Sequence, residues 1–227
     1  MSEVATAHSP RGEIMLRTRQ GRDEAPVHEL RVNGIFVMDD EETSSERALA
    51  RAAMDALGEV LMPVRVLVGG LGLGFTLDEL QRDPRAGEIV IVEIEEAVVD
   101  WHREGLIPGG PALLASPATT VVVDDVAAVI GASTAAFDLI LLDVDNGPRY
   151  LVHEQNAALY REEFLRTTTR ALTAGGALCV WAANEAPDLE AAMSAAFGTV
   201  EKISYPVRLQ GRDEHYLLYL SRLMSSV

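Results

Sequence analysis

The sequence is poor in cysteine and in lysine, and each shortage excludes a kind of chemistry. Its single cysteine, Cys179, excludes an internal disulfide and any metal cluster held by several cysteines. Cys179 lies within the apolar run 177–181, which indicates a core residue rather than a nucleophile. The single lysine, Lys202, makes arginine the source of nearly all fixed positive charge. We therefore expect no lysine chemistry in the first half of the chain.

Long apolar runs and excess positive charge are also missing. The longest apolar stretch is broken by Arg65 and by the glycines after it, so we expect no membrane-spanning segment. Residues 1–11 lack the basic-then-apolar layout of a secretion signal, so we expect a cytoplasmic, soluble protein. The formal net charge of −16 argues against binding nucleic acid and is compatible with a cationic substrate. His28, His102 and His215 are not spaced as metal ligands, so no metal is expected.

The amino-terminal part differs in pattern from the rest of the chain. Residues 1–42 are expected to form a polar tail and a small antiparallel β region, in which the dipeptide Asn33-Gly34 is a hairpin turn signal. Residues 43–227 are expected to form a helix followed by a Rossmann-like domain. Thr43 and Glu46 fit a capping box at the start of that helix.

From residue 64 onward, apolar runs alternate with helical patterns, which implies right-handed crossovers and a mainly parallel sheet. The connection between the last two strands is too short for a helix, so they should form an antiparallel hairpin. Strands are expected near 64–68, 88–93, 119–123, 137–143, 176–181, 199–205 and 216–220. Helices are expected near 74–82, 95–103, 126–130, 161–171 and 187–197. This α/β layout is typical of the Rossmann-like class I methyltransferase fold.

The most informative segment is the glycine-rich turn between the first two of these strands. An apolar run leads into Gly70, Gly72 and Gly74, and the next apolar run ends on Glu93. A glycine turn lets the backbone approach a ligand closely, and the free amides of the following helix favour an anionic or hydrogen-bonding group. An acid at the tip of the next strand can accept both hydroxyls of a ribose. The segment therefore predicts a site for a nucleoside cofactor.

The spacing of the glycines helps to distinguish the cofactors. A dinucleotide fingerprint needs its third glycine at position 75, where this chain has Phe75. The pattern Gly70-Leu71-Gly72-Leu73-Gly74 instead resembles motif I of class I S-adenosylmethionine-dependent transferases. A glycine turn that serves only packing is the alternative.

The order of features from about Gly12 to Leu220 resembles the spermidine synthase family of the class I transferase superfamily. The resemblance rests on the amino-terminal hairpin, on the glycine turn, and on the segments Ile91–Glu95, Val121–Asp125, Phe137–Asp143, Leu159–Phe164 and Ala171–Gly176. It implies S-adenosylmethionine, or its decarboxylated form, as cofactor and a small-molecule acceptor that can be a cationic amine. It also implies a homodimer.

The resemblance assigns the cofactor residues by position. The three glycines would lie beneath the sulfonium-bearing chain, and Glu93 would hold the ribose diol. Asp125 would accept the adenine amino group, with Asp124 beside it as the alternative partner. Because acids at such a place also cap helices, cofactor contact and helix cap both remain open for this pair.

The reaction centre is expected in the loop after the fourth strand, since ligands of open α/β sheets bind beyond the carboxyl ends of strands. Asp143, Asp145 and Asn146 are the candidate catalytic residues, and Asp143 is also a candidate cofactor contact. The comparable loop of aminopropyltransferases resembles Asp-x-x-Asp-Pro-x-Gly-Pro, whose second aspartate deprotonates the attacking amine. The loop here is shorter, so either Asp145 or Asn146 falls at that position, and an asparagine cannot take up a proton. A plain turn is the alternative.

The acceptor side of the site is less well defined. Tyr150, His153 and Tyr160 are the candidate acceptor-binding residues, and His153 is also a second choice of base. Tyr160 suits a core position at a helix start equally well. Trp181, at the end of the fifth strand, is expected to pack rather than to form a wall of the site.

Two departures from the family pattern bear on the reaction. The family's glycine loop carries an aspartate for the primary amine of decarboxylated S-adenosylmethionine, and its place here is Gly72. The family's Tyr-His-Glu segment corresponds to about 46–48, where the tyrosine and histidine are missing. Both departures favour intact S-adenosylmethionine and methyl transfer to a small-molecule nucleophile. Aminopropyl transfer to a polyamine and a non-catalytic cofactor-binding homologue are the alternatives.

Overall fold

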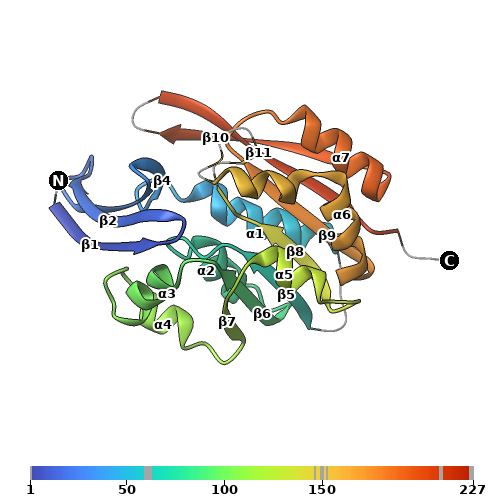
Figure 1. Ribbon diagram of the computed structural model, residues 1–227, viewed down its shortest axis with the longest axis horizontal. Helices are drawn as coiled ribbons and strands as arrows, with labels where there is room; N and C mark the ends of the chain where they lie inside the picture. The colour runs from blue at the N-terminus through green and yellow to red at the C-terminus, as the bar shows by residue number, and fades with distance from the viewer. Residues whose placement is uncertain are drawn as a thin grey trace.

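The computed structural model describes residues 2–58, 63–145, 147–148, 151, 153–209 and 212–224. These residues form two sheets, a four-stranded antiparallel sheet at the amino terminus and a seven-stranded, mostly parallel sheet (Figure 1). Helices cover both faces of the larger sheet, and the smaller sheet stands at one of its ends (Figure 1). The expected α/β class is confirmed.

The amino-terminal sheet has the strand order β1-β2-β3-β4. Its strands are β1 (Ser2–Ser9), β2 (Gly12–Gln20), β3 (Pro26–Val32) and β4 (Ile35–Asp39). Asn33 and Gly34 join β3 to β4 with φ angles of 51° and 77°, as a two-residue hairpin turn requires. Residues 1–42 were expected to hold a polar tail and a small antiparallel β region, and the structure includes residues 2–9 in that region as an edge strand paired with β2. The side chains of β1 are partly or fully exposed, so no apolar alternation marked this strand in the sequence.

The larger sheet has the strand order β10-β11-β9-β8-β5-β6-β7. The strands are β5 (Val64–Gly69), β6 (Ala86–Glu93), β7 (Thr119–Val123), β8 (Phe137–Leu142), β9 (Leu172–Ala182), β10 (Glu201–Leu209) and β11 (Arg212–Arg222). The strands from β5 to β9 pair in parallel, whereas β11 runs antiparallel to both β9 and β10. The predicted parallel sheet with a closing antiparallel hairpin is therefore confirmed.

The helices agree with the sequence prediction except for two short segments. The expected helices are α1 (Ser44–Ala56), α2 (Phe75–Arg82), α3 (Glu96–Arg103), α5 (Val126–Gly131), α6 (Glu162–Ala171) and α7 (Pro187–Phe197). The additional segments are α4 (Gly110–Leu114), which is only five residues long, and η1 (Glu154–Tyr160), a 3-10 helix whose period differs from that of an α-helix. No helix in the described part of the chain is long and apolar enough to cross a membrane.

Alternate residues of the central strands pack into two separate apolar cores, one on each face of the sheet. On β5, Val66 and Val68 pack with α1, α2 and α3 on one face of the sheet. Leu67, which lies between them, packs with α5, α6 and α7 on the other face. Because both faces are covered, these strands are apolar throughout, and their ends are the places where polar side chains meet.

The capping box predicted at the start of α1 is not formed. Thr43 occupies the cap position, but its side chain makes no capping hydrogen bond. The Glu46 carboxylate accepts a hydrogen bond from the Ser45 hydroxyl at 2.7 Å instead of reaching back to Thr43. Glu46 faces an interior pocket, and burial in that direction overrides the local capping pattern.

Candidate functional site

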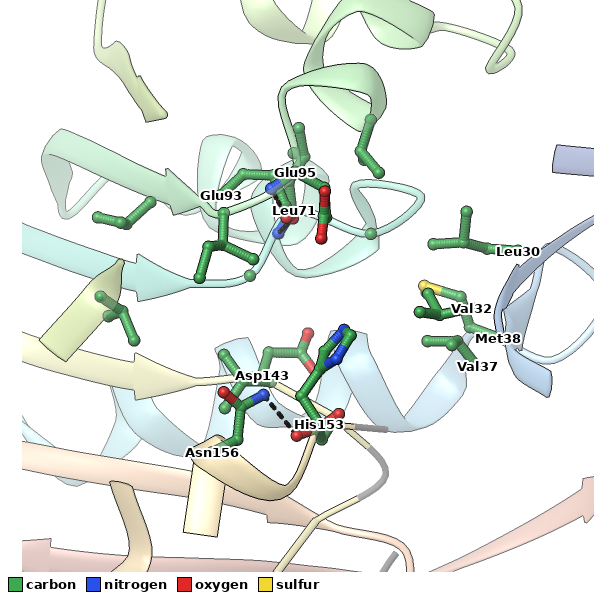
Figure 2. A pocket seen from close by; sticks show the side chains of 18 of the residues that line it. Leu30, Val32, Val37, Met38, Leu71, Glu93, Glu95, Asp143, His153 and Asn156 are labelled. Carbon is green, nitrogen blue, oxygen red and sulfur yellow. Dashed lines mark hydrogen bonds between the residues drawn. The ribbon is translucent and has the colours of Figure 1, made fainter. Parts of the chain in front are cut away.

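A pocket lies at the carboxyl ends of β5, β6 and β8, and the amino-terminal sheet closes its outer side. Figure 2 shows Leu71 and Glu93 on one wall and Asp143 with His153 on the opposite wall. Met38, together with apolar neighbours from β3 and β4, forms a third wall (Figure 2). The location is the one at which open α/β sheets bind ligands.

The glycine turn has backbone angles and close neighbours that exclude a side chain at its three glycine positions. Gly70, Gly72 and Gly74 have φ angles of 97°, 49° and 90°, in the left-handed region that favours glycine. A Cβ on Gly70 would collide with the carbonyl oxygen of Asp143, and one on Gly72 would lie 2.5 Å from the Met38 sulfur. Gly70 and Gly72 line the pocket, whereas Gly74 is the N-cap residue of α2. The bare backbone that faces the pocket fits a closely approaching cofactor.

Glu93 ends β6 and is 7 % exposed, within the pocket wall. Its carboxylate accepts hydrogen bonds at 2.9 Å from the backbone N–H of Leu71 and from that of Glu95. Burial raises the pKa of Glu93, and hydrogen bonds from backbone amides of Leu71, Gly72 and Glu95 oppose that rise. Glu93 therefore fixes the glycine turn itself. A carboxylate has about four acceptor positions, so it retains positions for hydroxyl donors from the pocket.

The aspartate pair after β7 lies at the start of α5 and at the rim of the pocket. Asp125 caps α5, because its carboxylate accepts a hydrogen bond from the Ala127 N–H at 2.8 Å. Asp124 accepts one from the Asp125 N–H at 2.7 Å. Both side chains also lie at the pocket rim and are exposed. The helix-cap interpretation therefore holds for Asp125, and the pair is also placed to meet a ligand.

Asp143 follows β8 and lies in the pocket wall across from Glu93. The Thr76 hydroxyl donates a hydrogen bond to its carboxylate at 2.6 Å. Burial raises the pKa of Asp143 to about 6, and the bond from Thr76 only partly offsets this rise. Asp143 is therefore a carboxylate that changes its charge close to neutral pH.

The loop after Asp143 brings two of the predicted residues to the pocket. Asp145 has a φ of 56°, and the Asn156 side chain donates a hydrogen bond to its carboxylate at 2.5 Å. His153 lies beside them and also lines the pocket (Figure 2). Asn146 and Tyr150, the other candidates from this loop, lie outside the described residues.

Tyr160 lies in the apolar core on the far side of the same loop. Its hydroxyl donates a hydrogen bond to the Val144 carbonyl at 2.8 Å. Burial raises its pKa far above the usual range of a tyrosine, so the hydroxyl stays protonated. The structure thus favours the core interpretation of Tyr160, in which it supports the backbone between Asp143 and Asp145.

Comparison with known proteins identifies the family. Residues 47–197 match the sequence profile described as the spermine/spermidine synthase domain. The chain belongs to the spermine/spermidine synthase family.

Two relatives of this chain carry different names. The chain is 36 % identical over 129 residues to putrescine N-methyltransferase 3 of Nicotiana tabacum, which covers 56 % of the chain and 32 % of the relative. It is 33 % identical over 186 residues to the polyamine aminopropyltransferase of Mycobacterium tuberculosis strain H37Rv. This match covers 79 % of the chain and 32 % of the relative. The chain thus spans about a third of the length of these curated relatives.

Solved spermidine synthases share the fold. The enzyme from Thermotoga maritima superposes with a TM-score of 0.78 over 97 % of this chain and 72 % of its own, at 18 % identity. A spermidine synthase in complex with the transition-state analogue AdoDATO superposes with a TM-score of 0.79 at 18 % identity. The match covers 97 % of this chain and 73 % of that structure's chain.

Within this spermine/spermidine synthase fold, Glu46 is a pocket residue that the sequence analysis missed. It is 7 % exposed and projects from α1 into the pocket wall. Burial and the nearby negative charge of Asp143 raise the pKa of Glu46 to about 7. A signal was present, because Glu46 precedes Leu49, Ala50 and Ala53 at the spacing of one buried helix face. An acid on such a face is unusual unless a site needs it.

Trp181 also lines the pocket, although it was expected only to pack. Its ring meets that of Tyr216 edge-to-face, with centroids 4.8 Å apart. The Trp181 indole nitrogen is buried and, among the described residues, has no hydrogen-bond partner. Burial, then the charge of Glu46, raises the pKa of Tyr216 to about 12, which keeps its hydroxyl protonated. An aromatic wall beside a carboxylate suits a cationic amine.

The charged side chains that line the described part of this pocket are all carboxylates. They are Glu46, Glu93, Glu95, Asp124, Asp125, Asp143 and Asp145. Glu95 is paired with Arg11 at 2.7 Å, and the other carboxylates of the lining attract cations and oppose the entry of anions. The spermine/spermidine synthase pocket of this chain is therefore electrostatically suited to a positively charged ligand.

Proposed function

We propose that this chain is a S-adenosylmethionine-dependent transferase that methylates a small cationic amine such as putrescine. The observation that carries the proposal is a single pocket with two parts. One part is the glycine turn, in which Gly70 and Gly72 present backbone without a Cβ near Glu93, and the other contains Glu46, Asp143 and Trp181.

The first part fits an adenosyl group. Gly70 and Gly72 would face the sulfonium-bearing chain, because their positive φ angles and close neighbours exclude a side chain at these two positions. Glu93 would accept the ribose hydroxyls with the acceptor positions that its backbone partners leave. Asp124 and Asp125 lie at the rim, where either could accept the adenine amino group.

The second part fits an amine. A protonated amine has no lone pair, so a carboxylate must take one proton before the nitrogen can attack. We assign this role to Asp145, which lies in the pocket wall and is oriented by Asn156. Glu46 and Asp143 would hold the cation and orient it. The new bond joins the nitrogen to the methyl carbon, the sulfur–carbon bond breaks, and the sulfonium becomes a neutral thioether.

Methyl transfer is the preferred reaction because of the glycine turn. The family's acid for the amine of the decarboxylated cofactor has no counterpart at Gly72, and the Met38 sulfur occupies the space next to it. The similarity to putrescine N-methyltransferase 3 of Nicotiana tabacum supports the same reaction. The backbone amides of the turn already donate hydrogen bonds within the chain, so the preference rests on the missing acid and on the relative.

Aminopropyl transfer is a second candidate, and the pocket charge favours it. Decarboxylated S-adenosylmethionine lacks a carboxylate and is more positive than the intact cofactor, which an all-carboxylate lining would stabilise. The similarity to the Mycobacterium tuberculosis polyamine aminopropyltransferase supports this alternative equally well.

The decisive experiment offers putrescine with each cofactor separately and identifies the products by mass spectrometry. We expect N-methylputrescine with S-adenosylmethionine and no spermidine with the decarboxylated form. Spermidine alone would replace the proposed reaction with aminopropyl transfer. Thermal stabilisation by NAD and by neither form of S-adenosylmethionine would contradict both, because a ligand stabilises a protein only by binding its folded state.

A further inference from the structure

The turn between β1 and β2 reaches across to the loop that follows β6. The Arg11 guanidinium donates a hydrogen bond at 2.7 Å to the Glu95 carboxylate and another at 2.6 Å to the Ile94 carbonyl. The Ser9 hydroxyl donates to the same Glu95 oxygen at 3.2 Å. These contacts join segments 83 to 86 residues apart in sequence.

This ion pair is largely shielded from water. The side chains of Arg11 and Glu95 are 28 % and 9 % exposed. A charge-assisted hydrogen bond that is partly buried holds its geometry better than an exposed pair does. One guanidinium thereby binds both the Ile94 carbonyl and the Glu95 carboxylate.

The held segment is directly connected to the proposed nucleoside site. The Glu95 N–H donates to one carboxylate oxygen of Glu93 at 2.9 Å, and the other oxygen accepts from the Leu71 N–H at 2.9 Å. Glu95 also lines the pocket, next to Glu93 (Figure 2). A continuous path of hydrogen bonds thus runs from Arg11 through Glu95 and Glu93 to the glycine turn.

We propose that Arg11 is a positioning residue for the cofactor, acting through Glu95 on the orientation of the Glu93 carboxylate. The amino-terminal hairpin is then part of the nucleoside site rather than only a cover of the acceptor pocket. This inference rests on the proposed function, because it assumes that Glu93 holds the ribose of an adenosyl ligand.

The test uses Arg11→Ala, with Arg17→Ala as the matched control. Arg17 is also on the amino-terminal sheet and forms an ion pair at 2.7 Å, but with Glu29 rather than with a residue of the pocket. Affinity is measured by calorimetry for methylthioadenosine and for its 2′,3′-dideoxy analogue. The fold is monitored by urea unfolding. The analogue separates an effect on ribose binding from a general loosening of the pocket.

We expect Arg11→Ala to weaken methylthioadenosine binding about tenfold, the size of a coupling between contacting residues. Binding of the dideoxy analogue should change by less than about twofold, and Arg17→Ala should leave both affinities near the wild-type values. Arg11→Lys should recover part of the loss, because it keeps the charge but not the two-pronged geometry. In a Glu95→Gln background, Arg11→Ala should have a smaller effect than in the wild type.

Other outcomes overturn the inference in a recognisable way. Equal losses for methylthioadenosine and its dideoxy analogue, or an equal loss in Arg17→Ala, would make Arg11 a purely structural tether. If Arg11→Ala binds methylthioadenosine with the wild-type affinity, Arg11 has no role in positioning Glu93. If the wild-type chain binds neither methylthioadenosine nor either form of S-adenosylmethionine, the proposed function fails first.

Discussion

At the scale of single residues, the buried acids of the pocket control its charge. The pKa of Glu46 is raised to about 7 and that of Asp143 to about 6, in both cases first by burial. The Asp143 charge also contributes to the rise at Glu46, as two neighbouring carboxylates oppose each other's ionisation. In the ligand-free protein these acids therefore change charge between mildly acidic and neutral pH, and a bound cation would favour their ionised forms.

The raised pKa of Glu46 predicts an unusual dependence of stability on pH. An acid whose folded pKa exceeds its unfolded value favours folding when protonated, and this contribution is lost as pH rises through the folded pKa. The shift from 4.5 to about 7 corresponds to roughly 3 kcal/mol, on the order of 1.4 kcal/mol per pKa unit. As pH rises from about 5 to about 8, the free energy of unfolding should therefore fall less for Glu46→Gln than for the wild type. Urea unfolding without ligand at both pH values measures the difference, and equal losses would contradict the burial argument.

Asp145 is the residue on which the proposed proton transfer depends. We expect Asp145→Asn to lower kcat about 100-fold, since an amide cannot accept the amine proton. Cofactor affinity should stay within about twofold, because the assigned role is in the acceptor part of the pocket. Steady-state kinetics and calorimetry measure the two effects separately. A wild-type kcat in Asp145→Asn would show that Asp145 is not the base, and Glu46, Asp143 or His153 would then be the candidates.

At the scale of elements, the glycine turn depends on its neighbours as well as on its own sequence. Gly72 has a φ of 49°, and its missing Cβ leaves space that the Met38 sulfur borders. The Leu73 N–H also points at that sulfur, at 3.3 Å. The turn after β5 is thus supported by β4, an element of the other sheet.

Gly72→Ala should disturb this turn for two reasons that can be separated. The left-handed backbone costs a residue with a Cβ about 1–2 kcal/mol, and contact with Met38 adds to this. Gly72→Ala/Met38→Ala should therefore recover part of the cofactor affinity lost in the single variant, beyond the effect of Met38→Ala alone. Calorimetric titration of the four proteins forms a double-mutant cycle. Strict additivity would show that Met38 does not restrict the turn.

At the scale of the whole molecule, electrostatics should govern acceptor binding. The net charge of −16 and the carboxylate lining of the pocket both attract a cationic amine. We expect the KM for putrescine to rise several-fold between about 20 mM and about 200 mM salt, as screening shortens the range of this attraction. The KM for S-adenosylmethionine, which carries both signs of charge, should change less. An acceptor KM independent of salt would contradict the proposed role of the lining. The expected homodimer stays a prediction.

The larger sheet and the glycine turn could be predicted because their signals are local. Continuous apolar runs mark strands buried on both faces, and the glycines of the turn have positive φ angles that other residues avoid. Glu93 was identifiable for the same reason, as an acid at the end of such a run. The capping box at Thr43 was a local signal too, but burial of Glu46 in the pocket overrode it.

The sequence by itself determined the α/β fold, the position of the glycine turn and the candidates at the strand ends, since periodicity and backbone preference act over a few neighbouring residues. Only the tertiary structure decided that Glu46 and Trp181 face the pocket, that Tyr160 belongs to the core, and that residues 2–9 form a strand. It also decided the contact of Arg11 with Glu95, 84 residues away in sequence. Each of these depends on which distant segments meet once the chain has folded, and the local pattern around Glu46 showed only that this acid lies on a buried helix face.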